Sequence, residues 1–333
     1  SYMIYYAGGD GNDVVLFEAS APTVVYVDDD AWSALSAGAA IADADLGPMG
    51  NQSAVFGVTA FQTIAAAQAA VGTGGTIIVN GGSYVAMTLS DSQTLEITGP
   101  DVAQAVTING LGSDVGTTIT IEGASTLTIV EAASQTINGT IEGSGDLIKQ
   151  GSGTLTLAGT NTYSGATTVS AGTLRLGSAS GRGTTAAGTT VNGGATLDLN
   201  GQTVAAEAIN LSGAGVGGLG SLINSNTGTA ASLAGSVTLA AASSIGGGGD
   251  LTLSGVIDDG VSDFVLTKLG TGVTTLSGAN TYSGATTVSA GTLRLGSASG
   301  LGTTAAGTTV NGGATLDLNG QTVAAEAINL SGA

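Results

Sequence analysis

The chain has 333 residues, of which 58 are glycine, 3 are proline and none is cysteine or histidine. Collagen would need glycine at every third position with abundant proline, and 42% apolar residues is too high a share for a disordered chain. The net charge of −19, from 5 Lys and Arg against 24 Asp and Glu, makes nucleic acid and anionic membrane surfaces poor partners.

Residues 1–60 combine short apolar runs with acidic loops. Strands are predicted at residues 3–6, 14–17 and 23–27, because β-branched and aromatic residues cluster there. Eight of the acidic residues lie within the first 45 positions. We expect residues 1–60 to form an N-terminal region of strands and acidic loops.

One string in this region is a candidate calcium site. GGDGNDVVL at residues 8–16 matches the nonapeptide of calcium-binding β-rolls, with oxygen ligands from Asp10, Asn12 and Asp13. A roll shares each ion between consecutive copies, and the sequence holds one copy. A plain Gly/Asn/Asp turn between two strands explains the same residues, so both interpretations stay open.

A second acidic segment follows the third strand. Asp28, Asp29 and Asp30 are adjacent and offer hard oxygen ligands for a cation such as calcium. Three adjacent acids also form an ordinary solvated loop. The sequence indicates no cofactor apart from this possible calcium.

The string FQTIAAAQAAV at residues 61–71 predicts a short helix. Phe61, Ile64 and Val71 recur near helical spacing, and Gly72 and Gly74 can end the helix. We expect residues 61–150 to hold this helix and the first coils.

From residue 76 onward, short Thr, Val, Ile and Leu runs alternate with glycine turns. Residues 161–214 reappear at 280–333, offset by 119 residues, with Arg182 replaced by Leu301. A fixed-period repeat is typical of solenoids. About a dozen coils are predicted, spaced ~4.8 Å apart. These patterns predict an all-β solenoid of stacked coils, in which residues 151–333 are the repeat coils.

Strand alternation predicts which side chains face inward. In TLRL, Leu174 points into the core and Arg175 points outward, and TLDL places Asp198 outward in the same way. A coil of 23 residues puts Arg175 beside Asp198. By the same spacing Arg294 lies beside Asp317. We expect both pairs to be exposed cross-strand ion pairs that fix register.

The string GSGTLTLAGTNTYSGATTVSAGTLRLG at residues 151–177, with a second copy at 270–296, resembles the autotransporter-associated β-strand repeat of bacterial passenger domains. The resemblance implies the fold class, an all-β right-handed parallel β-helix that is exported and either secreted or displayed at the cell surface, and it brings no active-site residues. The second copy stops where the first continues, which predicts a piece of a longer protein or a unit that joins end to end.

Residues 61–85 also resemble the opening of secreted pectate-lyase-like β-helices, with an Ala-rich helix, a glycine turn, TIIV and GGSY. In such proteins the helix covers the first coil, whose bare edge would otherwise recruit other strands. The resemblance therefore implies that the short helix near the N-terminus is a capping helix. The lyases among these proteins use clustered Asp ligands with Arg or Lys as the base. This chain has five basic residues, and most of them lie in the repeated coils.

These observations favour an extracellular structural or adhesive β-solenoid, a surface stalk or fibre module, rather than an enzyme. Its partners would be further copies in a head-to-tail filament, or cell-surface or matrix carbohydrate or protein. No run reaches the ~18 apolar residues of a membrane helix. The alternative is a polysaccharide-active secreted β-helix enzyme with its site in residues 28–150, although without His and Cys most nucleophile–base systems are missing.

Overall fold

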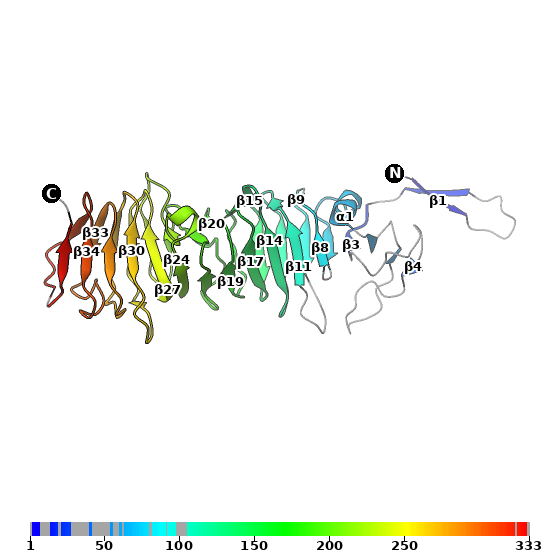
Figure 1. Cartoon of the computed structure of the whole chain (residues 1–333). Coiled ribbons are helices and arrows are strands. Elements are labelled where there is room, and N and C mark those ends of the chain that lie inside the picture. The colour runs from blue at the N-terminus through cyan, green and yellow to red at the C-terminus, as the bar shows by residue number, and fades with distance from the viewer. Residues whose placement is uncertain are drawn as a thin grey trace.

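The computed structural model describes residues 2–6, 14–18, 21–27, 40–41, 54–55, 60–61, 63–79, 82–90, 92–97, 105–323 and 325–331. The chain is a parallel β-solenoid of ~11 turns with one short helix, which confirms the predicted fold class. The coils follow one another along a single rod, from the helix to the C-terminal end (Figure 1).

The largest sheet has 20 strands and comprises two rows of parallel strands that run along the rod. The first row contains β8 (Gly82–Tyr84), β11 (Ala105–Asn109), β14 (Thr126–Val130), β17 (Asp146–Gln150), β19 (Thr167–Val169), β21 (Thr189–Val191), β24 (Ile209–Gly213), the first part of β27 (Val237–Gly246) and β29 (Ile257–Asp258). The second row contains β9 (Met87–Leu89), β12 (Leu111–Ser113), β15 (Gln135–Ile137), β18 (Thr154–Leu157), β20 (Thr173–Leu176), β22 (Thr196–Asp198), β25 (Leu222–Ile223), the second part of β27, β30 (Leu266–Leu269), β32 (Thr286–Val288), β34 (Thr308–Val310) and β36 (Ile328–Leu330).

Two six-stranded parallel sheets accompany these rows. One contains β16 (Thr140–Gly143), β13 (Thr118–Ile121), β10 (Thr94–Ile97), β7 (Thr76–Val79), β3 (Val24–Val27) and β6 (Ala60–Phe61). The other contains β23 (Thr203–Val204), β26 (Ala231–Leu233), β28 (Leu251–Leu253), β31 (Val273–Leu276), β33 (Thr292–Leu295) and β35 (Thr315–Asp317). Two antiparallel pairs lie near the N-terminus: β1 (Tyr2–Tyr6) with β2 (Val14–Glu18), and β4 (Ala40–Ile41) with β5 (Ala54–Val55). A 3₁₀ turn, η1, spans Val216–Gly218.

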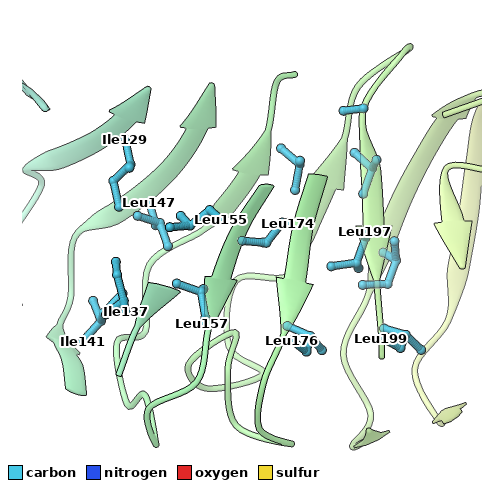
Figure 2. Packing of buried hydrophobic residues seen from close by; sticks show 14 of the residues in the cluster. Ile129, Ile137, Ile141, Leu147, Leu155, Leu157, Leu174, Leu176, Leu197 and Leu199 are labelled. Carbon is cyan, nitrogen blue, oxygen red and sulfur yellow. The ribbon is translucent and has the colours of Figure 1, made fainter. Parts of the chain in front are cut away.

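The core is a set of ladders in which like side chains stack from coil to coil (Figure 2). Leu155, Leu174 and Leu197 are partners in successive strands, and all three are fully buried. Each buried leucine contributes about 1.5–3 kcal/mol relative to an exposed one. The predicted inward assignment of Leu174 is confirmed, and the stacking of identical side chains aligns the coils.

The predicted helix is present but shorter than expected. Helix α1 (Ile64–Ala70) begins after Thr63, whose hydroxyl accepts the N–H of Ala66 at 3.2 Å. It ends at Val71, whose backbone is extended. Ile64 and Ala67 are buried, and the helix contacts β3, β6 and β7. The helix therefore packs on the first coils, where β3 pairs in register with β7.

The two repeats do not occupy the same faces of the solenoid. From Leu155 in β18, five coils along the second row lead to Lys268 in β30, a step of 268 − 155 = 113 residues. The repeat offset is 119 residues, six more than five coils. The counterpart of Leu155 is therefore Thr274 in β31, which belongs to a different sheet. The same sequence therefore lies on one face of the solenoid in the first repeat and on the next face around the rod in the second repeat.

Candidate functional site

The predicted calcium ligands all lie outside the described residues: Asp10, Asn12, Asp13, Asp28, Asp29 and Asp30. Calcium binding at these positions stays a prediction. Within the ranges that the structure describes, no group of three or more acidic side chains is placed to hold a metal ion. The candidate site is therefore the set of polar groups that the repeats bring together between coils.

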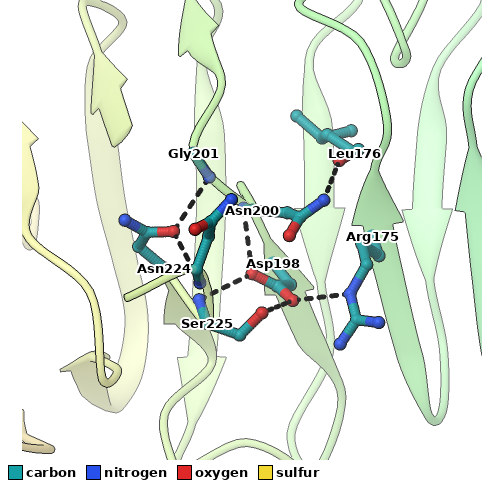
Figure 3. A network of polar contacts seen from close by, with 8 residues as sticks. Arg175, Leu176, Asp198, Asn200, Gly201, Asn224 and Ser225 are labelled. Carbon is teal, nitrogen blue, oxygen red and sulfur yellow. Dashed lines mark hydrogen bonds and ion pairs between the residues drawn. The ribbon is translucent and has the colours of Figure 1, made fainter. Parts of the chain in front are cut away.

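Arg175 of β20 and Asp198 of β22 pair across neighbouring coils, as the spacing predicts (Figure 3). The Nε of Arg175 donates to Oδ2 of Asp198 at 2.9 Å. Asn200 N–H, Ser225 N–H and the Ser225 hydroxyl also donate to this carboxylate, at 3.0, 3.0 and 2.6 Å. The expectation that the pair is exposed is wrong for Asp198, whose side chain is 0% exposed. The segment carrying Ser225 covers the carboxylate and replaces water with its own donors.

The equivalent pair of the second repeat is exposed, as expected. Arg294 of β33 donates through Nε to Oδ2 of Asp317 in β35 at 2.7 Å, and both side chains are more than one third exposed. The hydrogen bond from Arg294 and the N–H of Asn319 lower the pKa of Asp317. Because the repeats are shifted by one face, the two Arg–Asp pairs lie in different sheets of the solenoid.

Two lysines are buried at equivalent corners of the repeats. The ammonium of Lys149 donates to the carbonyls of Gln150, Gly151 and Ala171 at 2.6, 2.9 and 3.2 Å, so it joins two successive coils. Burial lowers its pKa to about 8, and the nearby Glu131 acts in the opposite direction. Residue 172 must be glycine, because its φ is +67° and a Cβ there would lie 2.3 and 2.4 Å from the carbonyl oxygens of Gly151 and Gly153.

Lys268 repeats this arrangement in the second copy. Its ammonium donates to the carbonyls of Leu269, Gly270 and Ala290 at 2.9, 2.9 and 3.0 Å. Burial lowers its pKa to about 8 as well. The sequence reasoning missed these buried lysines. The signal was present, because Lys149 stands two residues after the inward Leu147 and therefore on the same side of the strand.

A buried corner accompanies each repeat. Tyr163 is fully buried, and its hydroxyl pairs with that of Thr167 at 2.7 Å. Burial raises the pKa of Tyr163 to about 12. Asn161 accepts the N–H of Ile141 and donates to the carbonyl of Gly181, at 2.8 and 2.7 Å. Its amide therefore links three coils.

The one residue that differs between the copies lies beside this corner. Arg182 is 3% exposed and forms an ion pair with Glu207, which is 1% exposed and also accepts the hydroxyl of Thr189. Leu301 takes the place of Arg182 in the second copy and is equally buried. Sequence reasoning noted the substitution without assigning Arg182 a partner. The residue's position in a glycine-flanked corner gave no sign of which carboxylate it meets.

Two surface grooves are candidate binding sites. One, of about 410 Å³, is lined by glycines with Leu219, Ile223, Ser225, Leu269 and Thr271, and no titratable side chain lines it. The other, of about 260 Å³, is lined by small apolar side chains, Asn109, Gln135 and Glu131. Burial raises the pKa of Glu131, and its Oε1 accepts the N–H of Leu111 at 2.8 Å. A single carboxyl does not supply the pair that glycoside hydrolysis requires.

Comparison with known proteins places the repeats in a family. Residues 147–176 and 266–295 each match the model of the Passenger-associated-transport-repeat. An alignment over 143 residues, which covers 39% of this chain, shows 34% identity to the Adhesin BmaC autotransporter of Brucella suis biovar 1 (strain 1330). The chain spans only 4% of the length of that relative. No solved structure matches the chain.

In the part of the chain that the structure describes, no helix has the length and apolar character needed to cross a membrane. The matched ranges cover the strands that hold Lys149 and Arg175 in the first copy, and Lys268 and Arg294 in the second. The chain therefore carries two autotransporter passenger repeats on one parallel β-solenoid and is distantly related to an autotransporter adhesin.

Proposed function

We propose that the chain is a stalk module of a secreted or surface-displayed adhesin. The observation that carries this proposal is the unbroken stacking of coils through both repeats, with one apolar core. In a solenoid each coil contacts only its neighbours, so the structure extends along one axis and each added repeat makes the rod longer. The similarity to an autotransporter adhesin supports an extracellular location.

The stalk proposal predicts that adhesion resides elsewhere. Beads coated with the 333-residue chain should bind host cells and matrix no better than beads coated with an unrelated acidic protein. Protease added to intact bacteria that make the protein should release the chain, because a surface stalk is exposed. Strong bead binding would instead assign adhesion to the coils themselves, and protection from protease would remove the surface location.

A second candidate is a head-to-tail filament of further copies, because the near-identical repeats stack like coils on like. Leu330 of β36 is 75% exposed, whereas its counterpart Leu211 in the first repeat is fully buried beneath β27. Strands from another copy would cover this edge by β-augmentation. Electron microscopy tests the candidate, because single short rods at every concentration, with and without calcium, would eliminate it.

Non-enzymatic action is part of the proposal. Assays on acidic and neutral polysaccharides, with and without calcium, test the enzymatic alternative. Turnover that is lost when Glu131 or Asp28–Asp30 is replaced would overturn the stalk assignment.

A further inference from the structure

The two repeats provide a natural substitution experiment at one buried position. Residues 161–214 and 280–333 differ only where Arg182 becomes Leu301. In the first repeat, Arg182 neutralises Glu207 beneath a covering coil, in which Gly235 lies against the backbone of Glu207. In the second repeat, the matching carboxylate of Glu326 keeps only the hydroxyl of Thr308 as a donor among the described residues, at 2.8 Å.

The last described coil of the second repeat is uncovered, and the first repeat shows how such a coil is covered. There β25, β26 and β27 stack on β22, β23 and β24. Ile209 and Leu211 are consequently buried, whereas their counterparts Ile328 and Leu330 are 40% and 75% exposed. A coil that stacked in the same way on β35 and β36 would bury this apolar surface, which favours stacking.

The same coil would also remove Glu326 from water. With Leu301 in place of arginine, the repeat itself supplies no cation to that carboxylate. A buried carboxylate without a cation opposes burial, because desolvation disfavours its charged form. The residue at position 182 or 301 therefore sets the electrostatic cost of covering its repeat.

We propose that this position is the specificity determinant of the stacking face. With arginine at position 182, the first repeat is covered by a coil without charged residues near Glu207. With leucine at position 301, the second repeat requires a covering coil with a lysine or arginine directed at Glu326.

The test supplies the second repeat with the coil that covers the first. A copy of residues 215–263 is joined after Ala333, so that it follows the second repeat as it follows the first. Hydrogen exchange and limited proteolysis then report whether the joined strands are protected. Exchange in the core around Leu174 shows that the remaining chain is folded in every variant.

We expect the joined strands to be at least about tenfold less protected with Leu301 than with Leu301→Arg. Glu326→Gln should restore protection without arginine, because it removes the charge and keeps the shape. Leu301→Met is the matched control and should remain unprotected. Equal protection of the joined strands in the parent and in Leu301→Arg would overturn the role of this residue.

A second arm tests the basic partner. A lysine is introduced in turn at the joined counterparts of Ser232, Ala234 and Ser236, which lie in or next to the covering strand. At least one of these lysines should restore protection in the Leu301 chain and should add nothing in the Glu326→Gln chain. Failure of all three lysines, or an equal gain in the Glu326→Gln chain, would overturn the proposed partner chemistry.

Discussion

Arg182 and Leu301 occupy the same place in two otherwise identical segments, and each side chain is 3% exposed. Only Arg182 meets a carboxylate that is itself fully covered, that of Glu207. The same corner thus tolerates a buried cation or a buried apolar side chain, depending on whether the next coil encloses the glutamate.

Arg182→Leu should strongly destabilise the first repeat, because it leaves Glu207 buried without its cation. The expected loss is about 3–5 kcal/mol in the free energy of unfolding, measured by urea denaturation. Adding Glu207→Gln should recover most of it. Leu301→Met in the second repeat is the matched control and should change stability by less than about 1.5 kcal/mol, because it replaces one buried apolar side chain with another of similar volume. A small effect of Arg182→Leu would mean that water reaches Glu207.

The buried lysines predict a specific pH dependence. Burial lowers the pKa of Lys149 from 10.5 to about 8. Between pH 8 and pH 10.5 the unfolded chain binds more protons than the folded chain, so the free energy of unfolding rises with pH. The stability gained from deprotonating Lys149 is lost as the pH falls through about 8. Lys268 behaves in the same way.

Lys149→Met removes one of the two groups. It should lower stability overall, because three carbonyls lose their donor. The increase in stability between about pH 8 and about pH 9.5, measured by urea titration, should fall by about half. Tyr163 does not titrate in this window, since its pKa is about 12. An unchanged pH slope would show that the ammonium of Lys149 stays hydrated.

Leu174→Asp should unfold the coils around it. The side chain is fully buried between Leu155 and Leu197, so a carboxylate there has no partner. We expect a loss of at least about 4 kcal/mol. Thr168→Asp, on the outward side of β19, is the control and should change stability by about 0.5 kcal/mol or less. Similar melting temperatures for both variants would contradict the inward ladder.

Deletion of residues 161–279 should leave a folded, shorter rod. The deletion joins residue 160 to Asn280, and the sequence that follows differs from the native continuation only at Leu301. The rod should shorten by roughly 25 Å, since about five coils are removed at ~4.8 Å each. Small-angle scattering and electron microscopy measure the change. A deleted chain that unfolds would show that the repeats are not independent units.

Much of the fold follows from short-range pattern. Period-two alternation placed Leu174 inward and Arg175 outward, and the 23-residue spacing paired Arg175 with Asp198. The helix was predicted four residues too long, because Thr63 caps it late and Val71 leaves it early. The burial of Asp198 escaped prediction, since it depends on Ser225, which belongs to the connection between the repeats and not to the repeat itself.

The sequence by itself determined that like coils stack on like, because strand side chains alternate and the repeated leucines meet in register. Tertiary structure alone decided on which face each repeat falls, because 119 residues exceed five coils of this solenoid by six. It also decided which charges are enclosed. Burial of Glu207 or Lys149 depends on the residues of the neighbouring coil, and the sequence around either residue does not show which residues those are.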